Sequence, residues 1–209
     1  NLVKTYSYLN ADGTLAHQTL RYEPKGFSQR RPAKEGDRVG EKAASKDYFG
    51  GWWLWTLKGT EPVLYNLPEL IARPDEPVWF CEGEKDADLA MEMGWLATTV
   101  PMGAGKWRDS YTAALAGRVV HVFQDSDAQG ESHAELVARA LVAKRGRVRV
   151  LDWSKIWPEG RPEKADLSLY VAKYGDGETM AELGRKVRDA YMETSDDAVD
   201  RYEWDVAEV

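Results

Sequence analysis

The chain of 209 residues contains very little cysteine or histidine. Its one cysteine, Cys81, excludes an internal disulfide and any Cys-rich zinc module within these residues. The three histidines, His17, His121 and His133, show no metal-ligand spacing, and we expect all three to be structural. There is no run of about 18 apolar residues and no apolar signal-peptide core near the start. These absences exclude a membrane partner and predict a cytoplasmic location.

The residues that are present suit one sizeable core with a smaller satellite, since 43% are hydrophobic and 11% aromatic. The net charge of −7 is unevenly spread. Residues 1–60 hold 10 Lys/Arg against 6 Asp/Glu, residues 61–174 hold 14 against 18, and residues 175–209 hold 4 against 11. The last part is predicted to be a helix over 179–193 followed by an acidic tail or linker. Because most of the negative charge lies in this last part and residues 1–60 are net positive, the overall charge does not argue against nucleic-acid binding. Because the chain opens without methionine, we expect it to be a fragment.

Residues 1–60 are predicted to form a small β-rich basic subdomain. Polar and apolar residues alternate on both sides of Asp12-Gly13, which is a strong hairpin signal. The stretch 25–51 is rich in Lys, Arg and Gly and predicts a mobile basic loop.

A further strand is predicted in "GWWLWTLKG", residues 51–59. Its alternation puts Trp53 and Trp55 on one face and Trp52 on the other. Two interpretations stay open. The rings fill the core of a small β layer, or they stack on nucleic-acid bases beside the basic loop.

From residue 77 onward, short apolar runs alternate with helical patterns in the order βαβαβαβ. This order predicts an α/β fold with a parallel sheet flanked by helices, in which chemistry collects at the carboxyl ends of the strands. The predicted strands are 77–81, 97–100, 118–124 and 147–153, and the predicted helices are 84–94, 106–117 and 127–146.

Acidic residues follow two of these strands. Five of the seven positions from Glu82 to Asp88 are charged, and Asp125 and Asp127 follow the strand 118–124. Carboxylates two apart in extended chain point to the same side and can share a Mg²⁺ or Mn²⁺ ion. The alternative is that the acids only cap helices or occupy first helical turns. Two acidic clusters at neighbouring strand ends would repel each other, which favours a bound metal.

The two motifs "CEGEKDADLA" and "FQDSDAQG" resemble the signature of the Toprim family. The resemblance covers residues 77–152 and implies a Toprim, Rossmann-like catalytic domain, which we assign to residues 61–174. The flanks "YSYLNADGTLAHQTLRYEPKGFSQRRP", "LYNLPELIA" and "VPMGAGKW" resemble primase-related Toprim proteins of phages and mobile elements. Such proteins commonly carry a zinc-binding module before this portion and a helicase after it.

The resemblance also implies roles for particular acids. Asp125 and Asp127 hold the metal, and Glu82 acts beside them as general base or general acid. Asp86 and Asp166 are further acidic candidates. Asp166 matches an acidic position after the last strand of related primases.

Basic residues are candidates for nucleotide or nucleic-acid contacts. The stretch "PMGAGKW" lacks the Ser/Thr and the spacing of a Walker loop, so we reject an ATPase. Its Lys106 either meets a phosphate or belongs to a plain turn. The other candidates are Lys85 in the acidic motif and Lys25, Arg30 and Arg31 in the basic stretch.

Three functions remain. The first is a DNA primase fragment, a nucleotidyltransferase that makes short RNA primers from ribonucleotides on single-stranded DNA. The second is a metal-dependent Toprim nuclease that uses the same acids with water as nucleophile. The third is a noncatalytic module with a degenerate Toprim domain that binds single-stranded DNA or has a regulatory role. The intact acids disfavour the third, and the basic β subdomain favours the first over the second.

Overall fold

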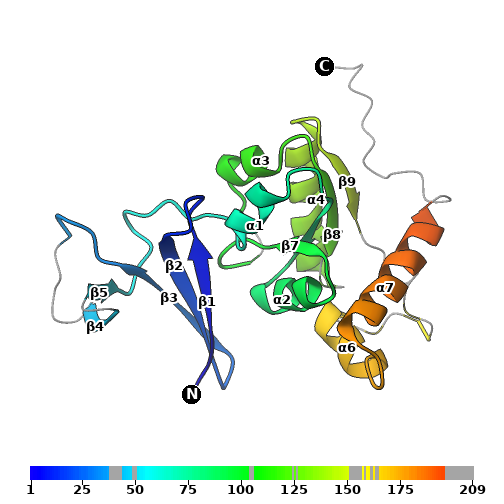
Figure 1. The fold of residues 1–209 in the computed structure, drawn as a ribbon, viewed down its shortest axis with the longest axis horizontal. Coiled ribbons are helices and arrows are strands. Elements are labelled where there is room, and N and C mark those ends of the chain that lie inside the picture. The colour runs from blue at the N-terminus through cyan, green and yellow to red at the C-terminus, as the bar shows by residue number, and fades with distance from the viewer. Residues whose placement is uncertain are drawn as a thin grey trace. The chain divides into compact units, whose positions relative to one another are not determined.

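The computed structural model describes residues 1–37, 44–48, 51–103, 106–123, 125, 127–150, 157, 159–160, 162 and 165–195. The chain forms two compact units, residues 1–72 and 73–209 (Figure 1). Within the described ranges, no helix has the length and apolar character needed to cross a membrane. The acidic tail predicted after the last helix falls on residues 196–209, outside the described residues.

An antiparallel sheet makes up most of the first unit. The hairpin predicted around Asp12-Gly13 is confirmed, because the strands on either side of it pair antiparallel. Gly13 in the turn adopts a φ of 81°, which glycine reaches without strain. The Thr14 amide donates to the Asp12 carboxylate at 2.9 Å and closes the turn. In spatial order the strands are β1 (Leu2–Leu9), β2 (Leu15–Tyr22), β3 (Gly26–Pro32), β5 (Gly51–Leu54) and β4 (Ala44–Tyr48).

The basic loop predicted for residues 25–51 is wrong in part, because β3 and β4 lie within it. The polar side chains of β3 pair across the sheet. Arg30 donates to Gln18 at 2.8 Å, and Gln29 donates to Thr19 at 3.4 Å. Cross-strand pairs of this kind stabilise a strand whose sequence lacks the usual apolar alternation.

Aromatic side chains fill the core of the first unit. Tyr65 precedes α1 (Leu67–Ala72) and packs on Tyr6 and Tyr8, with ring centroids 6.1 and 5.1 Å away. Trp53 is 2% exposed, so the core-filling interpretation is confirmed for this ring. The compact units divide after residue 72, whereas the sequence predicts divisions after residues 60 and 174.

A four-stranded parallel sheet forms the centre of the second unit, and it confirms the predicted βαβαβαβ order. Its strands lie in the spatial order β7-β6-β8-β9. Along the chain the elements are β6 (Val78–Cys81), α2 (Glu84–Glu92), β7 (Leu96–Thr98), α3 (Asp109–Leu115), β8 (Val119–Phe123), α4 (Ala128–Val142) and β9 (Arg147–Val150).

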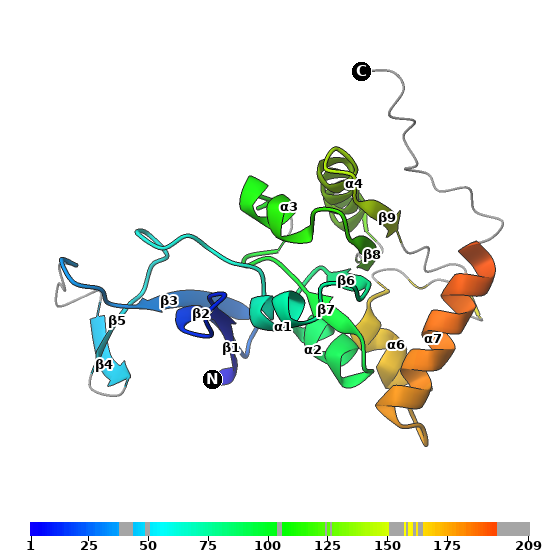
Figure 2. The ribbon, with the colours of Figure 1, turned by 45° about the horizontal axis from the view of Figure 1, so that its top comes forward.

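Helices cover both faces of this sheet. Figures 1 and 2 show α3 and α4 on one side and α2 with α6 (Leu167–Tyr174) and α7 (Met180–Ser195) on the other. The helix α7 confirms the one predicted over 179–193, whereas α6 is not predicted from the sequence. Every residue of β6 is buried. The acids that follow β6 therefore emerge directly from the core.

Candidate active site

The carboxyl ends of β6 and β8 lie side by side, because the two strands are parallel neighbours with Cys81 opposite Phe123. Glu82 follows Cys81 directly, and Asp125 lies two residues beyond Phe123. The Asp125 amide donates a hydrogen bond to Glu82 Oε2 at 3.1 Å. The structure thus joins the two acidic positions that the sequence predicts at neighbouring strand ends.

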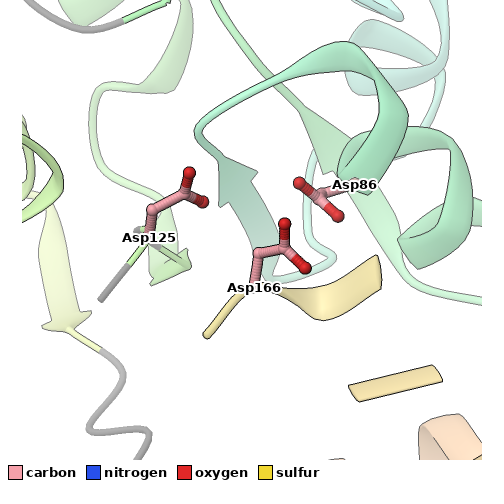
Figure 3. Close-up of side chains that lie close together, drawn as sticks. All are labelled: Asp86, Asp125 and Asp166. Carbon is pink, nitrogen blue, oxygen red and sulfur yellow. The ribbon is translucent and has the colours of Figure 1, made fainter. Parts of the chain in front are cut away.

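Three carboxylates converge beside this hydrogen bond. Asp86 lies in the first turn of α2, Asp125 lies just after the end of β8, and Asp166 caps the N-terminus of α6. One carboxylate oxygen from each lies within 4.8 Å of those of the other two. Figure 3 shows the three side chains pointing toward one another from three separate elements. Both additional acids named from the sequence, Asp86 and Asp166, belong to this group.

The pKa values record the crowding of negative charge. Burial, followed by repulsion from Glu82, Asp86, Asp166 and Asp127, raises the pKa of Asp125 to about 7. The pKa of Asp86 is raised as well, chiefly by burial, although its hydrogen bonds from Ser168 act in the opposite direction. The ionised cluster is therefore costly unless a cation shares it.

A metal ion fits this donor set. Asp86, Asp125 and Asp166 can each offer one oxygen to a common centre, and all three side chains are partly accessible to solvent. Carboxylate oxygens are the ligands that hard divalent cations prefer, and such a cation would offset the repulsion that raises the pKa of Asp125.

Asp127 lies beside the cluster and caps α4. Its Oδ1 accepts hydrogen bonds from the amides of Gln129 and Gly130 at 3.0 and 2.9 Å. This is the cap that the sequence offers as the alternative to metal binding. Asp127 is not one of the three converging carboxylates. Its role as a metal ligand stays a prediction.

Two supporting residues are missing from the sequence-based site. Ser168 donates from both its amide and its hydroxyl to Asp86 Oδ1, at 3.0 and 2.5 Å. A Cβ at Gly130 would lie 2.3 Å from the Asp125 carbonyl oxygen and 2.9 Å from Glu82 Oε2. The signals available were a serine two positions after Asp166 and a glycine three positions after Asp127.

Solved primases share this architecture. The primase fragment of the bacteriophage T7 primase-helicase protein aligns with a TM-score of 0.52 and 17% identity over 89% of this chain and 61% of that chain. The chain has the fold of primase catalytic fragments. The Aquifex aeolicus primase, comprising zinc-binding and RNA polymerase domains, aligns with a TM-score of 0.57 and 12% identity over 90% of this chain and 44% of that chain. The DnaG primase catalytic domain bound to single-stranded DNA aligns with a TM-score of 0.53 and 15% identity over 91% of this chain and 54% of that chain.

These alignments cover less than two thirds of each primase chain. No protein-family model matches the sequence, and a search of curated proteins finds no match. The likeness is one of fold, and the acids described above occupy the carboxyl edge of its parallel sheet.

The loop after β7 in this primase-type fold carries Lys106, which is exposed, while residues 104–105 lie outside the described part of the chain. Trp107 stands where a Walker loop would have Ser or Thr, and its ring packs on Phe80 with centroids 5.4 Å apart. Lys85 is exposed in the first turn of α2, next to Asp86. Phosphate contact by Lys85 or Lys106 stays a prediction.

The three basic candidates of the first unit have different surroundings. Lys25 is exposed, and Arg30 is half-buried on β3. Arg31 is 4% exposed, and its two terminal nitrogens bind the Asp37 carboxylate at 2.6 and 2.9 Å. Its Nε donates to the Lys58 carbonyl at 2.7 Å. Arg31 thus holds the fold of the first unit together, and we exclude it from the residues proposed below to contact template.

Proposed function

We propose that this chain is the catalytic portion of a DNA primase of the Toprim type found in phages and mobile elements. It would join ribonucleotides into short RNA primers on a single-stranded DNA template. The observation that carries this proposal is the convergence of Asp86, Asp125 and Asp166 beside Glu82 at the carboxyl edge of a sheet with the primase fold.

The chemistry of the site supports nucleotidyl transfer. Phosphoryl transfer demands little covalent work from the protein and depends on positioning and on neutralising negative charge. Mg²⁺ or Mn²⁺, held by Asp125 with Asp86 and Asp166, would supply that neutralisation. Asp127 is retained as a candidate ligand. Glu82 lies against the backbone of Asp125, where its carboxylate can take a proton from an attacking hydroxyl.

The partners follow from the same proposal. The positive first unit would hold the template strand, with Lys25 and Arg30 near its phosphates. Lys85 and Lys106, both exposed in the catalytic unit, are the candidates for incoming nucleotide phosphates. A zinc-binding module and a replicative helicase are the proposed neighbours, and the cytoplasm is the proposed location.

The decisive experiment measures primer synthesis with ribonucleotides, Mn²⁺ and a single-stranded DNA template. Glu82→Gln should lose at least about a hundredfold in rate, the usual size of a general-base contribution. Glu92→Gln is the matched control, because Glu92 is exposed at the far end of α2. Normal priming by Glu82→Gln would refute the assigned role of Glu82.

The same assay distinguishes a primase from a metal-dependent nuclease. A primase yields products only when ribonucleotides are present, whereas a nuclease shortens the DNA without them. Metal-dependent degradation of the template in the absence of ribonucleotides would replace the primase proposal with the nuclease. A wild-type chain that binds DNA but neither primes nor cleaves would indicate the noncatalytic module.

A further inference from the structure

A row of polar and aromatic side chains crosses the sheet of the first unit from β1 to the end of β5. We call Ser7, Gln18, Arg30 and Trp55 the Arg30 strip. Gln18 Nε2 donates to Ser7 Oγ at 3.0 Å, and Arg30 Nε donates to Gln18 Oε1 at 2.8 Å. The Arg30 guanidinium lies 4.1 Å from the ring centroid of Trp53 and 5.6 Å from that of Trp55. The strip is thus held in one arrangement by contacts on both sides of Arg30.

Arg30 has no carboxylate partner among the residues that the structure describes. Its Nε is used by Gln18, which leaves Nη1 and Nη2 for another acceptor. The adjacent Arg31 differs, because Asp37 binds both of its terminal nitrogens. A guanidinium that is already held by ring stacking and by one hydrogen bond loses little conformational entropy when it binds a ligand. Its planar fork of N–H donors suits a phosphate.

Trp55 supplies an apolar ring next to this cation. Its side chain is 40% exposed, whereas Trp53, which also contacts Arg30, is 2% exposed and belongs to the core. An exposed tryptophan beside a cation without a carboxylate partner in the described residues offers a flat surface and a charge within one nucleotide's reach.

We propose that the Arg30 strip binds single-stranded nucleic acid, with one unstacked base on Trp55 and a neighbouring phosphate at Arg30. A duplex keeps its bases stacked inside, so it would engage only the charge. An acidic peptide would also satisfy Arg30 but has no equivalent of the base. The inference rests on the proposed function only in identifying this strand as the primase template.

The test measures binding of a labelled oligothymidylate by fluorescence anisotropy in EDTA, without ribonucleotides. Trp55→Ala should weaken binding at least about fivefold, and Trp55→Phe should retain most of the affinity, because stacking on one ring contributes about 1–3 kcal/mol. Trp52→Ala is the matched control, since Trp52 is 44% exposed on the opposite face of β5 and should change affinity by less than about twofold.

An abasic oligonucleotide of the same length and charge isolates the base. Wild type should bind it at least about fivefold more weakly than oligothymidylate, and Trp55→Ala should remove that difference. Arg30→Ala should lower the slope of log affinity against log salt by about 0.7, the value for one contact to a single strand. Arg21→Ala removes the same charge from the other face of the sheet and should leave the slope unchanged.

Equal effects of Trp55→Ala and Trp52→Ala, or equal binding of the abasic probe by wild type, would overturn the proposal. Displacement of oligothymidylate by polyglutamate of equal charge with the same potency as by unlabelled oligothymidylate would point to an acidic peptide instead. Because the assay contains no metal or nucleotide, it does not depend on catalysis. If the oligonucleotide binds as expected but the protein does not prime, the primase proposal is refuted and the proposal for the Arg30 strip stands. If the protein primes but Trp55→Ala binds normally, the primase proposal stands and the proposal for the Arg30 strip is refuted.

Discussion

Asp125 should destabilise the metal-free protein at neutral pH, so replacing it should stabilise the fold. Burial and four neighbouring carboxylates raise its pKa from 3.8 to about 7. A carboxyl group whose pKa is higher in the folded protein than in the unfolded chain ionises more readily in the unfolded chain. At pH values above the unfolded-state pKa, this difference lowers the free energy of unfolding. The penalty is absent below about pH 3.8, grows as the pH rises, and is complete above about pH 7. Asp125→Asn cannot ionise and should escape it.

The size of the effect follows from the pKa. A change from 3.8 to about 7 corresponds at most to roughly 4 kcal/mol in the free energy of unfolding. Asp125 is partly exposed, so solvent screening reduces this figure to about 2 kcal/mol. For a chain of this length, about 2 kcal/mol raises the melting temperature by about 4–8 °C.

Calorimetry of wild type and Asp125→Asn in EDTA at pH 4 and pH 8 measures this effect. The variant should melt near wild type at pH 4 and several degrees higher at pH 8. Saturating Mn²⁺ at pH 8 should reverse the order, because ligand binding stabilises only the protein with an intact site. Asp109→Asn, an exposed acid on α3, is the control and should show neither change. A lower melting temperature for Asp125→Asn in EDTA at pH 8, or the same Mn²⁺ shift in both proteins, would refute the reasoning.

Two further substitutions test the residues that support the carboxylates. Ser168→Ala removes the hydroxyl that donates a hydrogen bond to Asp86 and should weaken Mn²⁺ binding about 10- to 100-fold, as measured by electron paramagnetic resonance. Ser168→Thr should restore much of the affinity, and equal affinities of Ser168→Ala and wild type would leave Ser168 a purely structural residue. Gly130→Ala would place a Cβ 2.3 Å from the Asp125 carbonyl oxygen and should lower stability by about 1–3 kcal/mol in urea unfolding. Gly83→Ala is the control, because Gly83 has open space around it and a φ of −141° that alanine also adopts; equal costs for the two substitutions would show that the close approach at Gly130 does not matter.

The parallel sheet could be predicted because β6, β7 and β8 are short, largely apolar runs between helical patterns, and β9 alternates arginine with valine after the last of those helices. The strand β3 could not, since its stability comes from polar pairs such as Arg30 with Gln18 rather than from alternation. The helix α6 was missed for a related reason. Its N-terminus is fixed by the Asp166 side chain, which accepts from the Leu169 amide at 2.5 Å, and by its contact with Asp86 through Ser168.

Some acids of the site could likewise be predicted from the strand pattern, and others could not. Glu82 and Asp125 end neighbouring parallel strands, so the strand pattern alone predicts that they meet. The backbone of Asp127 is extended, as the spacing of Asp125 and Asp127 assumes, but the Asp127 carboxylate accepts hydrogen bonds from the first amides of α4, which the spacing alone does not reveal.

The remaining oxygen donors come from Asp86 on α2 and Asp166 at the start of α6, two elements that the chain separates by about 80 residues but that pack against each other. Like charges at that junction oppose the packing of α6 on α2, and the two hydrogen bonds from Ser168 favour it. A cation shared by the carboxylates would change the first of these effects from repulsion to attraction. Metal binding and the docking of α6 are therefore coupled: the metal favours docking by the same free energy by which docking favours metal binding, so a substitution that undocks α6 should weaken metal binding by up to that amount.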